Sequence, residues 1–203
     1  MNNTALLRTA CFAVWASTLA AVRELPAQEN HSDEWLIASS VLAAPEEFRA
    51  SAEVRKYDEG GRLVTIREGS GVICIADRPG GEAFLASCYH ESLEPFMERG
   101  RQLRADGLEE MARQEARWAD IEAGRLSMPE SPTMVYNLQF PTEDFDPATM
   151  DPATGQRLHA IYVPYMTSES TGLSETPGVE PYLMWPGKPS AHIMIPLPPS
   201  SGN

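Results

Sequence analysis

Basic residues are scarce in this sequence of 203 residues. It has 16 Lys and Arg against 29 Asp and Glu, which gives a formal net charge of −13. A strongly acidic protein repels phosphate backbones and anionic lipid headgroups. We therefore expect neither nucleic acid nor a membrane surface as a partner, and we expect an unidentified small molecule or another protein instead.

The sequence also lacks recognisable catalytic and cofactor motifs. It has no phosphate-binding loop, dinucleotide fingerprint, metalloprotease helix motif or haem-attachment motif. Gly69-Ser70-Gly71 lacks the Gly two residues before the serine that a nucleophile elbow needs, and a hairpin turn is the interpretation we favour. The sequence predicts no cofactor and no metal site, and it leaves open whether the protein is an enzyme.

No apolar run is long enough to predict a membrane-spanning helix. The N-terminal apolar run, Thr9 to Val22, has 14 residues, whereas a spanning helix needs about 20. It follows Arg8 and ends near small residues, which is typical of a secretory signal peptide. We predict a signal peptide over residues 1–27, cleaved after Ala27 or, alternatively, after Ala20. The protein would then be exported, periplasmic or extracellular, with no membrane anchor after cleavage.

Cysteine is rare as well. Of the three cysteines, Cys11 lies in the predicted signal peptide, which leaves Cys74 and Cys88. An even number of cysteines in an oxidising compartment indicates a disulfide, and closing a loop of this length stabilises a fold by about 3 kcal/mol. A thiolate metal site with His90 is the less favoured alternative.

What the sequence does contain is a series of short β-type runs around a helical middle. Three runs separated by glycine turns (52–58, 62–68 and 72–77) predict an antiparallel meander, and 84–89 predicts either a fourth strand or a short packed segment. Residues 92–125 predict two helices with a break at Asp106-Gly107. Further β-type runs follow at 133–139, 160–167, 181–185 and 191–197, and Pro164 predicts that the second of these is an edge strand or bulged.

These runs predict one domain of the α+β class. We expect an antiparallel sheet with a two-helix layer on one face, spanning residues 52–197. Residues 28–51 are predicted to be a linker with a short apolar segment, and residues 198–203 a disordered tail.

Two blocks of the sequence resemble a loosely defined family of uncharacterised exported bacterial proteins. The first block is LVTIREGSGVICIAD at 63–77, followed by the second cysteine, and the other is GKPSAHIMI at 187–195. The chain departs from the family pattern at Val72 and Ile73, where a Trp is expected, and in its longer helical middle. The resemblance implies export and a shared α+β domain, and it implies no activity.

Two groups of residues are candidates for function. Tyr162, Tyr165, Trp185 and His192 lie in the Pro-rich C-terminal half near a Ser/Thr/Gly-rich loop, where aromatic side chains can form a ligand cleft. They favour a non-catalytic binding or structural protein. The alternative is an exported hydrolase that uses His90 or His192 with a carboxylate.

An acidic loop, Glu143 to Asp146 and on to Asp151, has the carboxylates that Ca²⁺ prefers but not the spacing of an EF-hand. We favour the interpretation that each Asp-Pro pair there caps a single helical turn.

Overall fold

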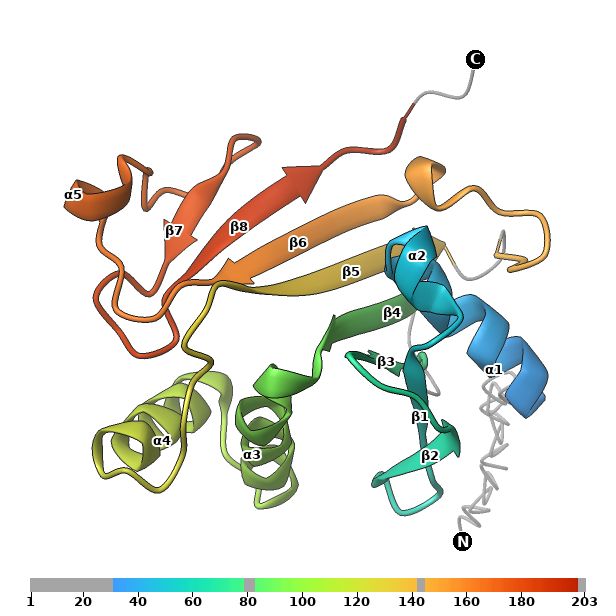
Figure 1. Ribbon diagram of the computed structural model, residues 1–203, viewed down its shortest axis with the longest axis horizontal. Helices are drawn as coiled ribbons and strands as arrows, with labels where there is room; N and C mark the ends of the chain where they lie inside the picture. The colour runs from blue at the N-terminus through green and yellow to red at the C-terminus, as the bar shows by residue number, and fades with distance from the viewer. Residues whose placement is uncertain (1–30, 79–82, 142–144, 201–203) are drawn as a thin grey trace, which may run out of the picture.

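The computed structural model describes residues 31–78, 83–141 and 145–200. These residues form an α+β fold, in which helices lie against a mixed eight-stranded sheet (Figure 1). The strands are β1 (Glu53–Tyr57), β2 (Leu63–Arg67), β3 (Val72–Ile75), β4 (Ala83–His90), β5 (Thr133–Pro141), β6 (Gln156–Tyr162), β7 (Tyr182–Met184) and β8 (His192–Leu197). The helices are α1 (Asp33–Ser40), α2 (Glu46–Arg49), α3 (Glu94–Ala105), α4 (Glu110–Glu122) and α5 (Ser168–Thr171), with 3₁₀ turns η1 (Val41–Ala43), η2 (Glu91–Leu93) and η4 (Pro152–Thr154). The predicted signal peptide lies outside the described residues.

The sheet has the strand order β2-β1-β3-β4-β5-β6-β8-β7. Every neighbouring pair is antiparallel except β1 and β3, which are parallel. The prediction of a simple antiparallel meander over 52–77 is therefore wrong, because the chain passes from β2 over β1 before it forms β3.

Gly69 explains this crossing. The turn that we predicted at residues 69–71 carries the chain past the beginning of β1, where the Ser70 N–H donates to the Ser51 carbonyl at 2.9 Å. A Cβ atom at Gly69 would overlap the backbone of residues 51–53. Only glycine lets the two backbones approach so closely, so the glycines that suggested a hairpin permit a crossover instead.

The predicted disulfide is present. Cys74 and Cys88 are bonded to each other, lie directly opposite on β3 and β4, and are fully buried. The bond joins two central strands of the sheet within its core.

The sheet has a hydrophobic core on each face. In β3, alternate side chains belong to different cores: Val72 and Cys74 to one, Ile73 and Ile75 to the other. Side chains of α1 and η1 pack against the first core, and side chains of α3 and α4 pack against the second. Because both faces are covered, β3 is buried along its whole length, as expected for a strand between two layers.

The two predicted helices of the 92–125 segment are confirmed as α3 and α4, which meet at the predicted break, and Figure 1 shows them side by side. Residues 33–49, within the segment that we expected to be a linker and a short apolar stretch, form α1, η1 and α2. Within the described residues, no helix has both the length and the apolar character to cross a membrane.

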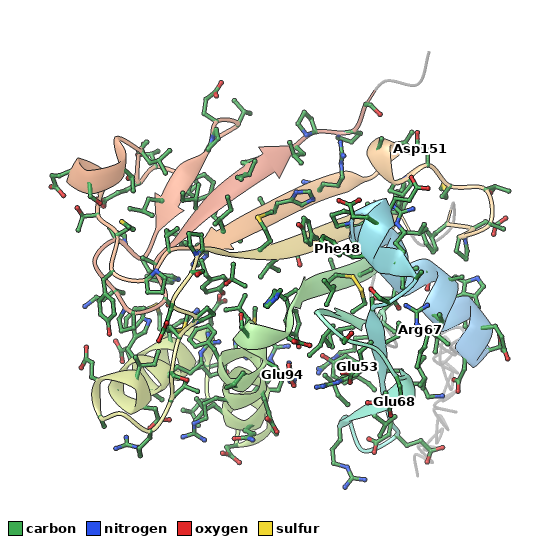
Figure 2. The ribbon with its side chains drawn as sticks, viewed as in Figure 1. Phe48, Glu53, Arg67, Glu68, Glu94 and Asp151 are labelled. Atoms are coloured by element: carbon green, nitrogen blue, oxygen red, sulfur yellow. A yellow bond between two sulfur atoms is a disulfide. The ribbon has the colours of Figure 1, made fainter. Side chains whose placement is uncertain are left out.

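A charged network joins α3 to the sheet. Glu94 accepts from Arg55 of β1, from Arg101 at 2.6 Å and from the Tyr89 hydroxyl at 2.6 Å. Arg55 also pairs with Glu53 at 2.5 Å, and Figure 2 shows Glu53 and Glu94 at this junction. Burial, and next the nearby Glu94, raise the pKa of Tyr89 despite the opposing effect of Arg101. The network fixes the position of α3 against the sheet.

The predicted edge strand at 160–167 differs in the structure. β6 ends at Tyr162, before Pro164, and lies between β5 and β8 rather than at an edge. Proline cannot donate to a β-ladder. The strand therefore stops short of the proline; it begins at Gln156, four residues earlier than predicted.

Candidate functional site

A groove of about 610 Å³ lies beside α2, near the central strands of the sheet. We call it the α2 groove. Its walls come from α2, the beginning of β3, the end of β4 with η2, and the segment that leads into β5. The lining residues are Phe48, Gly71, Val72, His90, Ser92, Pro129, Glu130, Ser131, Pro132, Thr133, Met134 and Tyr136.

Strand register brings these walls together. Val72 of β3 lies opposite His90 of β4, and Cys88 lies opposite Tyr136 of β5. The groove thus lies where three adjacent central strands begin or end, on the face that α1 and η1 cover. The disulfide is two residues inside the Val72–His90 pair, so it holds two of the walls in register.

Most of the groove is apolar. Val72 is buried, Met134 and Tyr136 are half-buried, and the ring of Phe48 is 41% exposed on the surface of α2. The edge of the Tyr136 ring packs on His159 of β6, with the ring centroids 5.1 Å apart. A concave apolar surface with a few polar groups is typical of a small-molecule site.

Two arginines hold α2, and therefore Phe48, in place. Arg67 donates to the Ala52 carbonyl at 2.8 Å and to the Arg49 carbonyl at 2.7 Å, and Arg49 donates to the Ala44 carbonyl at 2.9 Å. Burial lowers the pKa of Arg67. Figure 2 shows Phe48 and Arg67 in this region. Since a helix of four residues has little stability of its own, these bonds position the aromatic ring.

His90 and Ser92 form a polar pair in the groove. The Ser92 N–H donates to His90 Nδ1 at 3.2 Å, and the Ser92 hydroxyl oxygen lies 2.9 Å from the same nitrogen. Because Nδ1 accepts from a backbone N–H, the proton of the neutral ring is on Nε2. The arrangement caps η2, and it also leaves the Ser92 hydroxyl in contact with a base.

The four residues predicted to bind a ligand lie elsewhere. Tyr162 and His192 are directly opposite on β6 and β8, where their buried rings stack with centroids 4.8 Å apart. His192 Nδ1 lies 2.8 Å from the Ser190 carbonyl, to which it donates. Burial is the main cause that lowers the pKa of His192.

Trp185 joins the same cluster through Trp118 of α4. The two indoles meet edge to face with centroids 5.4 Å apart, and Trp118 Nε1 donates to the Ser190 hydroxyl at 2.7 Å. We call Trp118, Tyr162, Trp185 and His192, gathered around Ser190, the α4 cluster. Tyr165 is 54% exposed. Neither the α2 groove nor the second cavity described next is lined by any of the four predicted residues, and ligand binding by them stays a prediction.

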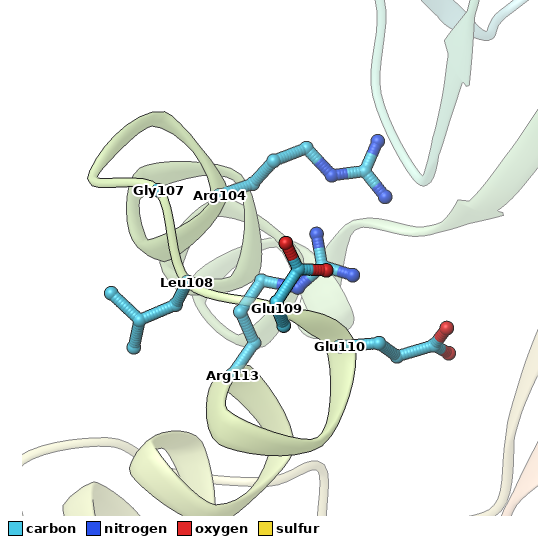
Figure 3. A pocket seen from close by; sticks show the side chains of 6 residues that line it. All are labelled: Arg104, Gly107, Leu108, Glu109, Glu110 and Arg113. Carbon is cyan, nitrogen blue, oxygen red and sulfur yellow. The ribbon is translucent and has the colours of Figure 1, made fainter.

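A second cavity, of about 380 Å³, lies where α3 meets α4. Figure 3 shows its lining residues, which come from the end of α3, the turn and the beginning of α4: Arg104, Gly107, Leu108, Glu109, Glu110 and Arg113. Two positive and two negative charges on an exposed helix junction form a solvated polar surface, so this cavity is a weaker candidate than the α2 groove.

The acidic loop has the capping role that we favoured at Asp151. Asp151 caps η4 by accepting the Ala153 N–H at 2.8 Å, and Pro152 occupies the first turn; Figure 2 shows its position. Asp146 likewise accepts the Ala148 N–H at 3.0 Å. Glu143 and Asp144 lie outside the described residues. Within the part of the chain that the structure describes, no group of three or more His, Cys, Asp or Glu is arranged to hold a metal ion.

Sequence reasoning did not identify the α2 groove. Phe48 lies in the predicted linker, and residues 129–132 form an unremarkable Pro/Ser loop. Of its lining residues, His90 alone had been proposed as a functional group, and it was proposed for catalysis rather than for its place in a cavity. Comparisons with protein-family models, with curated proteins and with solved structures give no match to this chain.

Proposed function

We propose that this protein is an exported binding protein that holds a mainly apolar small molecule in the α2 groove. The volume of the groove carries the proposal, because about 610 Å³ falls within the range of small-molecule sites, roughly 300–1,000 Å³. The partly exposed ring of Phe48 supports it. Because Phe48 is 41% exposed, burying the rest of its side chain against a ligand would contribute about 1 kcal/mol.

Export is part of this proposal. Two observations support it: the disulfide between Cys74 and Cys88, which is typical of oxidising compartments, and the apolar N-terminal pattern. The resemblance to exported bacterial proteins agrees with both. Sequencing the N-terminus of the protein recovered from the cell envelope or medium tests export, and an intact N-terminus in the cytosol with both thiols free would contradict it.

Titration with a neutral fluorescent dye that brightens in apolar surroundings tests the groove. The change Phe48→Ala should weaken dye binding about tenfold, since tenfold corresponds to about 1.4 kcal/mol. Met111→Ala is the matched control, because Met111 is 47% exposed on α4 and does not line the groove. Equal losses in the two variants would show that the dye binds nonspecifically.

A hydrolase is the second candidate, and the contact between Ser92 and His90 favours it. The serine hydroxyl could attack the carbonyl carbon of an ester bound in the groove, with its proton passing to His90 Nδ1 in place of the bond from the Ser92 N–H. The ester C–O bond then breaks, the alcohol leaves with that proton, and water hydrolyses the acyl-serine. The hydrogen bonds and ion pairs of the described residues place no carboxylate on His90 or His192. Hydrolysis of a short-chain p-nitrophenyl ester that is lost in both Ser92→Ala and His90→Asn would support this function, and a rate equal to that of the variants would exclude it.

A further inference from the structure

The charges at the α2 groove are of one sign. Among its lining residues, all of which the structure describes, Glu130 is acidic and there is no Lys or Arg. Glu91 accepts the N–H of the lining residue Gly71 at 2.7 Å, which places a second carboxylate at the wall. Burial, followed by the charge of Glu47 on α2, raises the pKa of Tyr136.

The nearest arginines on α2 and β2 do not offset these carboxylates within the groove. Arg49 donates to the Ala44 carbonyl before α2, Arg67 donates to the Arg49 and Ala52 carbonyls at its other end, and neither arginine lines the groove. A ligand in the groove therefore meets carboxylates and aromatic rings. An anionic ligand would be repelled there, whereas a cation would be attracted by the carboxylates and by the aromatic rings of Phe48 and Tyr136.

We propose that the α2 groove selects amphipathic cations: small molecules with an aliphatic or aromatic body and a positively charged ammonium head. The body packs against Phe48, Val72 and Met134, and the head lies near the Glu130 carboxylate. The inference rests on the proposed function, because it names the ligand class of the same groove.

Three probes that share an eight-carbon chain test the inference: octyltrimethylammonium, octyl glucoside and octyl sulfate, each below its critical micelle concentration. Isothermal titration calorimetry of the full protein measures their affinities. We expect the cation to bind about fivefold tighter than the neutral probe and the anion to bind weakest, with the preference shrinking at high salt.

Two carboxylate variants separate a local effect from the overall negative charge. Glu130→Gln should weaken binding of the cation about threefold and leave the neutral probe unchanged. Glu122→Gln removes an exposed carboxylate of α4 outside the groove and should change neither. Equal losses of cation binding in the two variants would overturn the inference, since the preference would then come from net charge.

The outcomes also separate the two proposals. If the three probes bind equally, or if the anion binds tightest, and Phe48→Ala weakens all of them, the cation preference is wrong and the binding groove stands. If no probe binds in a way that depends on Phe48, both proposals fail.

Discussion

The α4 cluster and the α2 groove differ in how their aromatic side chains are used. In the α4 cluster, Trp118 and His192 both bond to Ser190, and the stacked rings of Tyr162 and His192 are buried. In the α2 groove, Phe48 lies on a four-residue helix, 41% exposed, and faces a cavity. The rings of the α4 cluster pack against partners from other elements and fill a core, whereas Phe48, on a short helix held by arginine side chains, remains partly exposed beside a cavity.

The largest expected effect is a loss of stability when Trp118 is removed from the α4 cluster. Trp118→Ala deletes a buried indole and its bond to Ser190, which should lower the free energy of unfolding by about 3–5 kcal/mol. Trp118→Phe keeps most of the packing and should cost less. Urea unfolding measures both. If Trp118→Ala left stability unchanged but abolished ligand binding, the α4 cluster would be the site and the comparison would be reversed.

Removing the disulfide should affect the groove region next most strongly. The double change Cys74→Ala and Cys88→Ala should lower the free energy of unfolding by about 3 kcal/mol. It should also weaken binding of the neutral dye, because the bond holds β3 and β4 in register just inside Val72 and His90. Unaltered dye binding at a temperature where the variant is folded would show that the walls need no such support.

Loosening α2 should weaken binding in the groove and cost the rest of the fold only a little stability. Arg67→Ala removes the bonds to the Ala52 and Arg49 carbonyls, which should cost about 1–2 kcal/mol and weaken dye binding. Arg62→Ala is the control, because Arg62 is 83% exposed and its ion pair is with Asp58 on the surface. Equal dye affinity in both variants would indicate that Phe48 does not depend on this anchor.

The smallest expected effect is a dependence of stability on pH that comes from the α4 cluster. Burial lowers the pKa of His192 below its ordinary value of 6.5, so below pH 6.5 the unfolded chain binds a proton that the folded chain excludes. Stability should then be complete above pH 6.5 and fall as the pH is lowered toward the folded pKa. His192→Gln should flatten this slope in urea unfolding between pH 7.5 and 5.5, while an unchanged slope would assign it to other groups.

Local patterns in the sequence predicted much of the fold. The β-type run at 72–77 that forms β3, the two helices on either side of Asp106-Gly107 and the Asp151 cap all depend on near neighbours in the chain. The pairing of β1 with β3 could not be predicted, because Gly69 permits a hairpin and a close crossover equally well. The strand around Pro164 was misplaced for a related reason: the proline showed where a strand cannot continue, and not where it begins.

The sequence by itself determined the acidic charge and the types of most elements. It also determined the cystine partners, since only Cys74 and Cys88 remain outside the predicted signal peptide. Only the tertiary structure decided which aromatic residues are buried and where a cavity is left. Whether an aromatic ring is buried or exposed depends on which residues the fold places next to it. The groove residues come from four segments that are far apart in the chain, so local sequence patterns do not show that they meet.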